Sequence, residues 1–321
     1  MTTPRAVYTA LLGDYEELSE QSVARTSDVP FICLTDRDDL VSDTWTIVKV
    51  ELPFPFDLVR SQRHFKILGH PSLDEYEETL YIDNSVQLDA SPEDILDHWL
   101  DGADFSLHRH SFRERVIDEF DEIVRLNYDD AGRVNEQLLH YAEAYPDVLL
   151  EQPYWNGMLA RRRTPEVQAT MRIWFDHVLR YSRRDQLSAN VAFSLGSVEP
   201  RVVGHDNNVS PWHRWPVDVK RRAAQSVVTG RRTGPLLAEV ARLEREVLLE
   251  RKRADDLIAG REAADERVRA AELELAEADA RTARAELRFE HVISSFSWRA
   301  SKPIRVIGGK IRRLRAGRPT D

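Results

Sequence analysis

The chain has 321 residues, of which 42% are hydrophobic and 31% charged, and its formal net charge at pH 7 is -10. The length suits one globular domain with an appendage, and the charged fraction exceeds the ~25% of ordinary domains, which indicates an extended, solvated segment. The negative charge argues against a protein whose main task is binding nucleic acid, because neutralising phosphates requires a broad basic surface.

Cysteine usage and apolar runs bear on the compartment. The single cysteine, Cys33, excludes a disulfide within the chain and a cysteine-ligated zinc site. The N-terminal residues lack the apolar core of a signal peptide, and no apolar run approaches the ~18 residues of a membrane span. We therefore expect a cytoplasmic protein, soluble or peripheral on the inner face of the membrane.

Apolar runs separated by helical patterns predict an α/β fold with a mostly parallel sheet. Strands are expected at 6–12, 30–34, 45–50, 80–82 and 104–110. Helical patterns cover 58–68, 113–126, 133–144 and the segment that opens at Thr164. Ser91, followed by a proline and two acids, has the residue types of a helix N-cap and first turn.

Polar residues follow the strand at 80–82 and form the first candidate site. Asp83, Asn84 and Ser85 stand where that strand gives way to a loop. Ligands of open α/β sheets bind beyond the carboxyl ends of the strands, so Asp83 is a candidate active-site residue. The same three residue types are also typical of an ordinary turn.

Two later segments carry side chains that could contact a ligand. His108 and Arg109 end the strand at 104–110 and could donate to phosphate oxygens, although paired surface histidines are more often incidental. The segment 151–160 mixes aromatic residues with amides, including Asn156. We expect it to form a rigid loop against a polar, ring-shaped ligand, with a hydrophobic corner as the alternative.

Charged residues and a lone histidine complete the candidates. Arg184, Asp185 and Gln186 follow the helix that opens at 164, and they could equally form a solvated helix junction. His205 lies in the aperiodic stretch 204–216. It could be a metal ligand that reaches back to Asp83, a role that a lone loop histidine usually lacks.

A heptad pattern extends from Leu236 to Phe296, with Gly260 as its only glycine and no proline. About nine heptads fit one register and predict a coiled-coil rod of roughly 90 Å. We expect a parallel homodimer. A single helix held by i,i+4 charge pairs is the alternative.

Basic residues interleaved with apolar ones follow the heptads and suit an anionic bilayer surface. Nucleic acid as a partner, or a disordered tail, remain alternatives for this segment. The predicted organisation is a domain over 1–216, a linker over 217–235, a coiled coil over 236–296 and a basic amphipathic tail over 297–321.

The region from about 7 to 203 resembles a GT-A-type glycosyltransferase family that includes plant hexosyltransferase-like proteins of pectin and mucilage synthesis. The tail from Ser297 is similar to ends seen on glycosyltransferases of bacterial surface-polysaccharide clusters. The resemblance rests on Tyr8-Thr9-Ala10, Gly13-Asp14-Tyr15, Leu34-Thr35-Asp36, the helix from Arg60 to Lys66, Tyr81-Ile82-Asp83-Asn84-Ser85, His108-Arg109-His110 and Arg184-Asp185-Gln186-Leu187.

The resemblance implies a GT-A-like nucleotide-sugar-binding domain, and a sugar donor, most simply a UDP-sugar. It places the base and ribose near Tyr8, Thr9 and Asp36. Arg60, Arg63 and Lys66 stand at helical i, i+3 and i+6, where they could share a broad face and neutralise the diphosphate. The other residues implied to bind substrate are Asn84, Ser85, His108, Arg109, Asn156, Arg184 and Gln186.

The resemblance also implies a metal and a catalytic carboxylate. Asp83 would face Mg²⁺ or Mn²⁺ bridging the diphosphate, and Ser85 stands where the family has a second acid, so His205 is the candidate that would complete the metal's ligands. Asp185 is the candidate base or acceptor-positioning group.

The expected acceptor is a cell-surface polysaccharide or lipid-linked glycan. Two other functions are open: a non-catalytic coiled-coil scaffold with a degenerate glycosyltransferase domain, and a hydrolase of phosphate or glycosidic esters.

Overall fold

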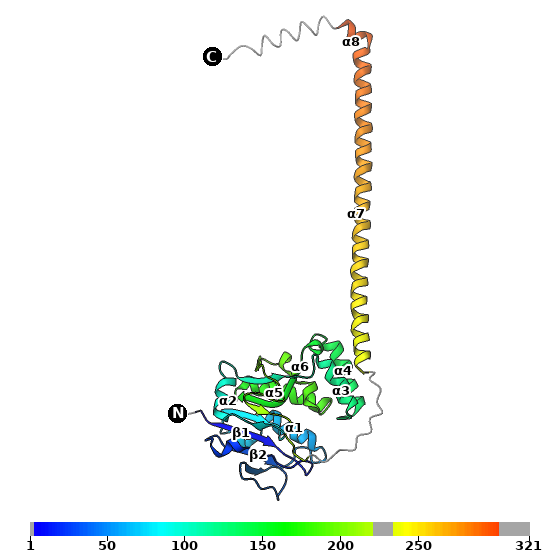
Figure 1. Ribbon diagram of the computed structural model, residues 1–321. Helices are drawn as coiled ribbons and strands as arrows, with labels where there is room; N and C mark the ends of the chain where they lie inside the picture. Colours follow the sequence, from blue (N-terminus) through cyan, green and yellow to red (C-terminus); the bar gives the residue numbers. More distant parts are fainter. Residues whose placement is uncertain (1–2, 221–233, 302–321) are drawn as a thin grey trace, which may run out of the picture. The chain divides into compact units, whose positions relative to one another are not determined.

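The computed structural model describes residues 3–220 and 234–301 (Figure 1). Contacts between residues divide the chain into two compact units, Met1–Arg245 and Glu246–Asp321. The predicted linker lies partly, and the basic tail mostly, outside the described residues. The predicted domain boundaries stay predictions.

A seven-stranded sheet forms the centre of the first unit, with the strand order β3-β2-β1-β4-β7-β6-β8. All neighbouring pairs are parallel except those that β7 makes with β4 and with β6, so β7 alone runs the other way. The mostly parallel α/β sheet predicted from the sequence is confirmed. The strands are β1 (Arg5–Ala10), β2 (Phe31–Thr35), β3 (Thr46–Lys49), β4 (Glu78–Ile82), β6 (Phe105–Arg109), β7 (Tyr154–Arg162) and β8 (Arg201–Val202), and a separate pair joins β5 (Gln87–Leu88) to β9 (His213–Arg214).

Successive residues of a strand point to opposite faces of the sheet. Both faces carry apolar side chains, and helices pack on each of them. Tyr8 and Tyr81 pack in one apolar cluster with α1 (Leu58–Leu68), α5 (Pro165–Arg180) and α6 (Ala189–Leu195). Val7 and Leu80, their immediate neighbours, pack in a second cluster with α2 (Pro92–Trp99).

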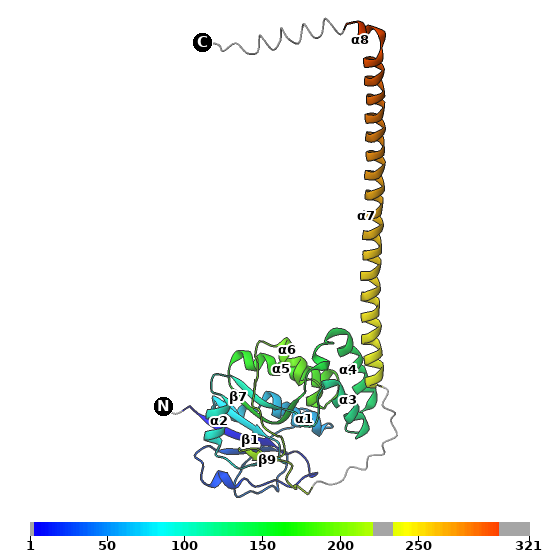
Figure 2. The same cartoon turned by 45° about the horizontal axis from the view of Figure 1, so that its top comes forward.

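A third apolar cluster contains residues of α3 (Val116–Arg125) and α4 (Ala131–Ala144), helices that lie side by side in Figure 2. It also includes Ala238 from the start of α7 (Gly234–Ser294). The remaining short helices are η1 (Ser22–Arg25), η2 (Pro71–Leu73), η3 (Val148–Leu150), η4 (Asp185–Leu187) and α8 (Phe296–Ala300).

Helix α1 carries the basic residues of the site, and local signals set its ends. The Asp57 side chain accepts a hydrogen bond from the backbone N–H of Arg60 and so caps the first turn. Gly69 ends the helix at a φ of 82°, a conformation that residues with a Cβ rarely adopt. The helix therefore covers the residues that the sequence pattern predicted.

The expectation of a loop at 151–160 is wrong, since most of this segment lies in β7. Every residue from Tyr154 to Arg161 is buried, with neighbouring strands on both sides. Gly157 is required there by packing: a Cβ on it would lie 2.3 Å from Cζ2 of Trp155. The glycine and amides that suggested a loop are thus accommodated inside the sheet.

In the second unit the chain continues as α7, which leaves Leu257, Val268 and Phe289 more than half exposed. The predicted long helix is confirmed, and its pairing into a coiled coil stays a prediction. Within the described part of the chain, no helix combines the length and apolar character that crossing a bilayer requires.

Candidate functional site

Asp83 lies directly after β4, at the carboxyl edge of the parallel strands. Its backbone N–H donates to the carbonyl of Gly157 on β7 at 2.8 Å, and its side chain is 33% exposed. Asp83 Oδ1 accepts a hydrogen bond from the Tyr81 hydroxyl at 2.6 Å, and Lys66 Nζ lies 3.4 Å from the same oxygen. Asp83 is therefore an accessible carboxylate held by two donors.

Helix α1 brings two cations to a buried carboxylate next to Asp83. Lys66 Nζ lies 2.9 Å from Asp185 Oδ2, and Arg63 Nε lies 2.7 Å from Asp185 Oδ1. The side chains of Lys66 and Asp185 are 2% and 4% exposed, and that of Arg63 is 13% exposed. Asn156 Nδ2 on β7 donates to Asp185 Oδ2 at 3.4 Å. We call Arg63, Lys66, Arg184, Asp83 and Asp185 the charge cluster.

The chain fixes the backbone of Asp185 as well as its side chain. The indole N–H of Trp174, on α5, donates to the Asp185 carbonyl at 2.9 Å. The prediction that this segment could be a solvated helix junction is wrong, because a buried carboxylate here meets cations from α1.

The cations determine the ionisation of Asp185. Burial alone would raise its pKa, but the charges of Arg63 and Lys66, followed by that of Arg184, outweigh burial and hold the pKa well below its usual range. A carboxylate held so far below neutral pH is a weak proton acceptor. The structure therefore favours a counter-ion role for Asp185 over the base role inferred from the sequence.

The phenol of Tyr81 keeps its proton, because burial and the charge of Asp83 raise its pKa well above the ordinary value. Gln62 Nε2 donates to the Tyr81 oxygen at 2.7 Å, which leaves the phenolic proton for Asp83. Sequence reasoning missed the roles of Tyr81 and Gln62. The alternation of strand residues, which sends positions 81 and 83 to the same side, could have indicated the first.

Arg184 extends the charge cluster toward α3. Its guanidinium lies 4.9 Å from the ring centroid of Tyr128. Burial and the charge of Arg63 lower its pKa, and the charges of Asp185 and Glu119 partly compensate. Glu119 lies 3.1 Å from Arg113, yet burial outweighs that attraction and raises the pKa of Glu119 to about 7.

Of three residues that the resemblance assigned to the donor, two hold other parts of the domain and the third is buried. Tyr8 is fully buried, and its hydroxyl donates to the carbonyl of Lys66 at 2.8 Å. Thr9 is equally buried. Arg60 donates to the carbonyls of Val178 and Tyr181 near the end of α5, so its guanidinium is engaged by the backbone there.

Asp36, Asn84 and Ser85 hold the loops around the site. Asp36 Oδ1 accepts from the N–H of Gly13 at 2.8 Å, which joins the loops after β1 and β2. Asn84 bonds to the segment 16–19 through both its amide nitrogen and its oxygen. Ser85 Oγ accepts from Trp215 Nε1 at 3.1 Å.

His108, Arg109 and His205 lie apart from the charge cluster. His108 is fully buried, bonds through Nδ1 to the carbonyl of Val203 at 2.7 Å, and has a pKa that burial lowers to about 4. Arg109 stacks on the ring of Tyr154 at 4.1 Å.

His205 follows β8, which β7 and β6 separate from β4 in the sheet, and its ring contacts those of His108 and Trp212. Three strand spacings amount to ~14 Å. The structure therefore does not bring His205 to Asp83, and the expected shared metal site is not formed.

Comparisons with known proteins identify the family of the chain and say less about its chemistry. Residues 31–202, just over half of the chain, match the family described as "TOD1/MUCI70, glycosyltransferase-like domain". No curated protein matches the chain.

Solved structures with a related fold include three glycosyltransferases. The apo bifunctional glycosyltransferase WbbM has a TM-score of 0.37 at 9% identity over 63% of this chain, which spans 39% of WbbM. Core-mannan synthase A from Aspergillus fumigatus, in a Mn/GDP form, has a TM-score of 0.39 at 12% identity, covering 74% of this chain and 82% of the synthase. Mouse xyloside xylosyltransferase 1, in apo form, has a TM-score of 0.35 at 8% identity, covering 62% and 84%.

These low scores carry no inference about the chemistry of this chain. The family match does not depend on them, and it includes α1, β4, β7 and η4, the elements that supply the charge cluster. The chain belongs to the TOD1/MUCI70 glycosyltransferase-like domain family.

Proposed function

We propose that the first unit transfers a sugar from a nucleotide-sugar donor, a UDP-sugar, to a cell-surface polysaccharide or lipid-linked glycan. The family match supports the class of reaction. The observation that carries the proposal is the pair of buried cations, Arg63 and Lys66, beside the carboxyl end of β4. Open α/β sheets bind ligands at that edge, and a diphosphate requires such cations.

The reaction breaks the bond between the sugar and a diphosphate leaving group. Negative charge grows on the leaving oxygen, and cations already held in place stabilise it without reorganising. Asp83 is the more accessible carboxylate of the charge cluster. We assign it to the sugar side, where it accepts hydrogen bonds from hydroxyl groups and, for an inverting reaction, the proton of the acceptor.

Mg²⁺ or Mn²⁺ was the expected cofactor, and the residues around Asp83 fit a metal poorly. Asp83 Oδ1 already accepts from Tyr81 and lies near the Lys66 ammonium. Asn84 and Ser85, the next residues of the motif, are bonded to other loops. Hard divalent cations prefer several oxygen ligands, and this arrangement offers one free carboxylate oxygen.

A thermal-shift screen of nucleotide sugars, with and without Mn²⁺, tests the proposed donor class. We expect a UDP-sugar to raise the melting temperature. Asp83→Asn should abolish sugar transfer while the fold and nucleotide binding survive, because the side chain is partly exposed and its removal leaves the Asp185 ion pairs intact. Full transfer by Asp83→Asn would refute the assigned role.

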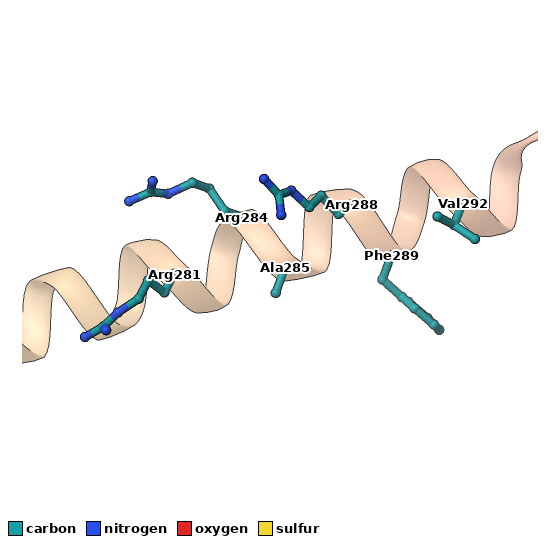
Figure 3. Close-up of a pocket in the computed structure, with 6 residues that line it drawn as sticks. All are labelled: Arg281, Arg284, Ala285, Arg288, Phe289 and Val292. Carbon is teal, nitrogen blue, oxygen red and sulfur yellow. The ribbon is translucent and has the colours of Figure 1, made fainter.

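A scaffold without catalytic activity is the second candidate, and α7 favours it. Arg281, Arg284, Arg288, Ala285, Phe289 and Val292 line a hollow on the surface of this single helix (Figure 3). In the predicted heptads, Ala285, Phe289 and Val292 fall on the apolar stripe. Absence of binding to every nucleotide sugar and nucleoside diphosphate would favour the scaffold.

The same stripe supports the proposed parallel homodimer. Arg267 and Arg281 occupy g positions, and in a parallel, in-register pair they would face Glu272 and Glu286 of the partner subunit at e positions. Attachment of the basic tail to an anionic membrane, and a cytoplasmic location on its inner face, complete the proposal.

A further inference from the structure

We propose that Arg63, Lys66 and Arg184 bind the donor's diphosphate directly, with no divalent cation between the protein and the phosphates. The inference rests on the proposed function and states how the site binds the phosphates of the donor.

The balance of charge in the cluster favours an added anion. Arg63 and Lys66 lie within ion-pair distance of Asp185, Lys66 also lies 3.4 Å from Asp83, and Arg184 is close enough for its charge to act on Asp185. Asp185 uses one oxygen for Arg63 and the other for Lys66, so it orients both cations and neutralises one unit of charge. A diphosphate supplies further negative oxygens, for which guanidinium groups have matching geometry.

Donor groups without an acceptor flank Asp185 in the sequence. Among the residues described, Arg184 Nε and Gln186 Nε2 are buried nitrogen atoms with no hydrogen-bond partner. A buried N–H without an acceptor is costly, and a phosphate oxygen is an acceptor that could satisfy it. These two donors belong to the residues immediately before and after Asp185, which pairs with Arg63 and Lys66.

Lys66 lies beside the carboxylate that a metal would need as a ligand. Its ammonium is 3.4 Å from Asp83 Oδ1 and is held by Asp185 and by the Tyr81 ring, at 5.1 Å from the ring centroid. A divalent ion bound to Asp83 would lie close to this buried positive charge, and like charges repel strongly where water is excluded. The lysine thus supplies the charge that a metal would otherwise provide.

Calorimetric titration of the full-length protein with inorganic pyrophosphate and with UDP, in EDTA and in Mn²⁺, tests the inference. We expect both ligands to bind in EDTA, with dissociation constants within about threefold of those in Mn²⁺. Lys66→Met and Arg63→Met should each weaken binding by at least about tenfold, which corresponds to ~1.4 kcal/mol.

Arg5→Met is the matched control. Arg5 forms a 2.8 Å ion pair with the buried Glu78, at the starts of β1 and β4 and thus at the opposite edge of the sheet. Its loss should lower stability without changing pyrophosphate affinity. If Lys66→Met fails to fold, Arg184→Gln tests the inference in its place. Arg184 makes neither of the short ion pairs with Asp185, so the variant should fold, and it should bind pyrophosphate severalfold more weakly.

The outcomes separate the inference from the proposed function. Binding of pyrophosphate and UDP only in Mn²⁺, or unchanged affinity in Lys66→Met and Arg184→Gln, overturns the inference and leaves the glycosyltransferase proposal intact. Binding of pyrophosphate in EDTA with no binding of UDP or any nucleotide sugar supports the anion site and refutes the nucleotide-sugar function.

Discussion

Replacing Asp185 by alanine should destabilise the first unit more than any other single change in the charge cluster. The substitution leaves Lys66 and Arg63, whose side chains are 2% and 13% exposed, without the carboxylate that pairs with both. Breaking a buried ion pair by removing one partner costs roughly 3–5 kcal/mol, because the remaining charge stays buried and uncompensated. For a unit of this size that loss corresponds to a fall of roughly 10 °C in the melting temperature.

Urea denaturation at neutral pH, followed by tryptophan fluorescence, measures the effect. Asp83→Ala is the comparison, and it should cost less than ~1.5 kcal/mol, because Asp83 is 33% exposed and Lys66 keeps its closer partner. Pyrophosphate should restore part of the stability lost in Asp185→Ala, since it offers Lys66 and Arg63 a new counter-ion. A loss below ~1 kcal/mol in Asp185→Ala, or a larger loss in Asp83→Ala, would contradict the assignment of Asp185 as the central counter-ion.

Three further predictions address other parts of the chain. Burial raises the pKa of Glu119 from 4.5 to about 7, so the folded state holds this proton more tightly than the unfolded state does. The contribution of Glu119 to stability should therefore be fully present below pH ~4.5 and fall by up to ~3 kcal/mol as the pH rises through ~7, and Glu119→Gln should remove this part of the slope when the two proteins are compared in pH-dependent urea melts. Gly157→Ala should lower the free energy of unfolding by ~2 kcal/mol or more in the same assay, because the added Cβ would lie 2.3 Å from Trp155 Cζ2. An unchanged free energy of unfolding would mean that the indole can move aside. Phe289→Asp should convert the proposed dimer to a monomer in analytical ultracentrifugation, while Leu287→Asp, similarly exposed but outside the heptad stripe, should not; equal effects of both would refute the stripe.

Local signals in the sequence were sufficient for much of the fold. Helix α1 begins after Asp57 and ends before Gly69, and both residues act within a turn of themselves. Strands β1 and β2 are short apolar runs that can be recognised without their neighbours. By contrast, β7 was predicted as a loop because Gly157 and the polar residues beside it are typical of loops, and only the strands on either side explain their burial.

The candidate site could be predicted only in part from the sequence, because part of it depends on contacts between distant segments. Asp83 follows from its place at the end of a strand, and Arg63 and Lys66 were implied by the family resemblance. The role of Asp185 as a counter-ion follows from neither, because Arg183-Arg184-Asp185 has the composition of a solvated surface, and its burial depends on contact with a helix far away in the sequence. The spacing of Arg60 suggested a phosphate-binding role, whereas its guanidinium is bonded to carbonyl groups near the end of α5, a contact that spacing does not reveal.

The position of β1 has a practical consequence for work on this family. The matched region begins at Phe31, yet β1 ends at Ala10 and pairs with β2 on one side and β4 on the other. A recombinant fragment cut at the family boundary would lack an inner strand and leave two unpaired edges in the middle of the sheet, which favours aggregation. A negative binding or activity assay on such a fragment would then report on its folding, so fragments intended for expression should begin upstream of Arg5.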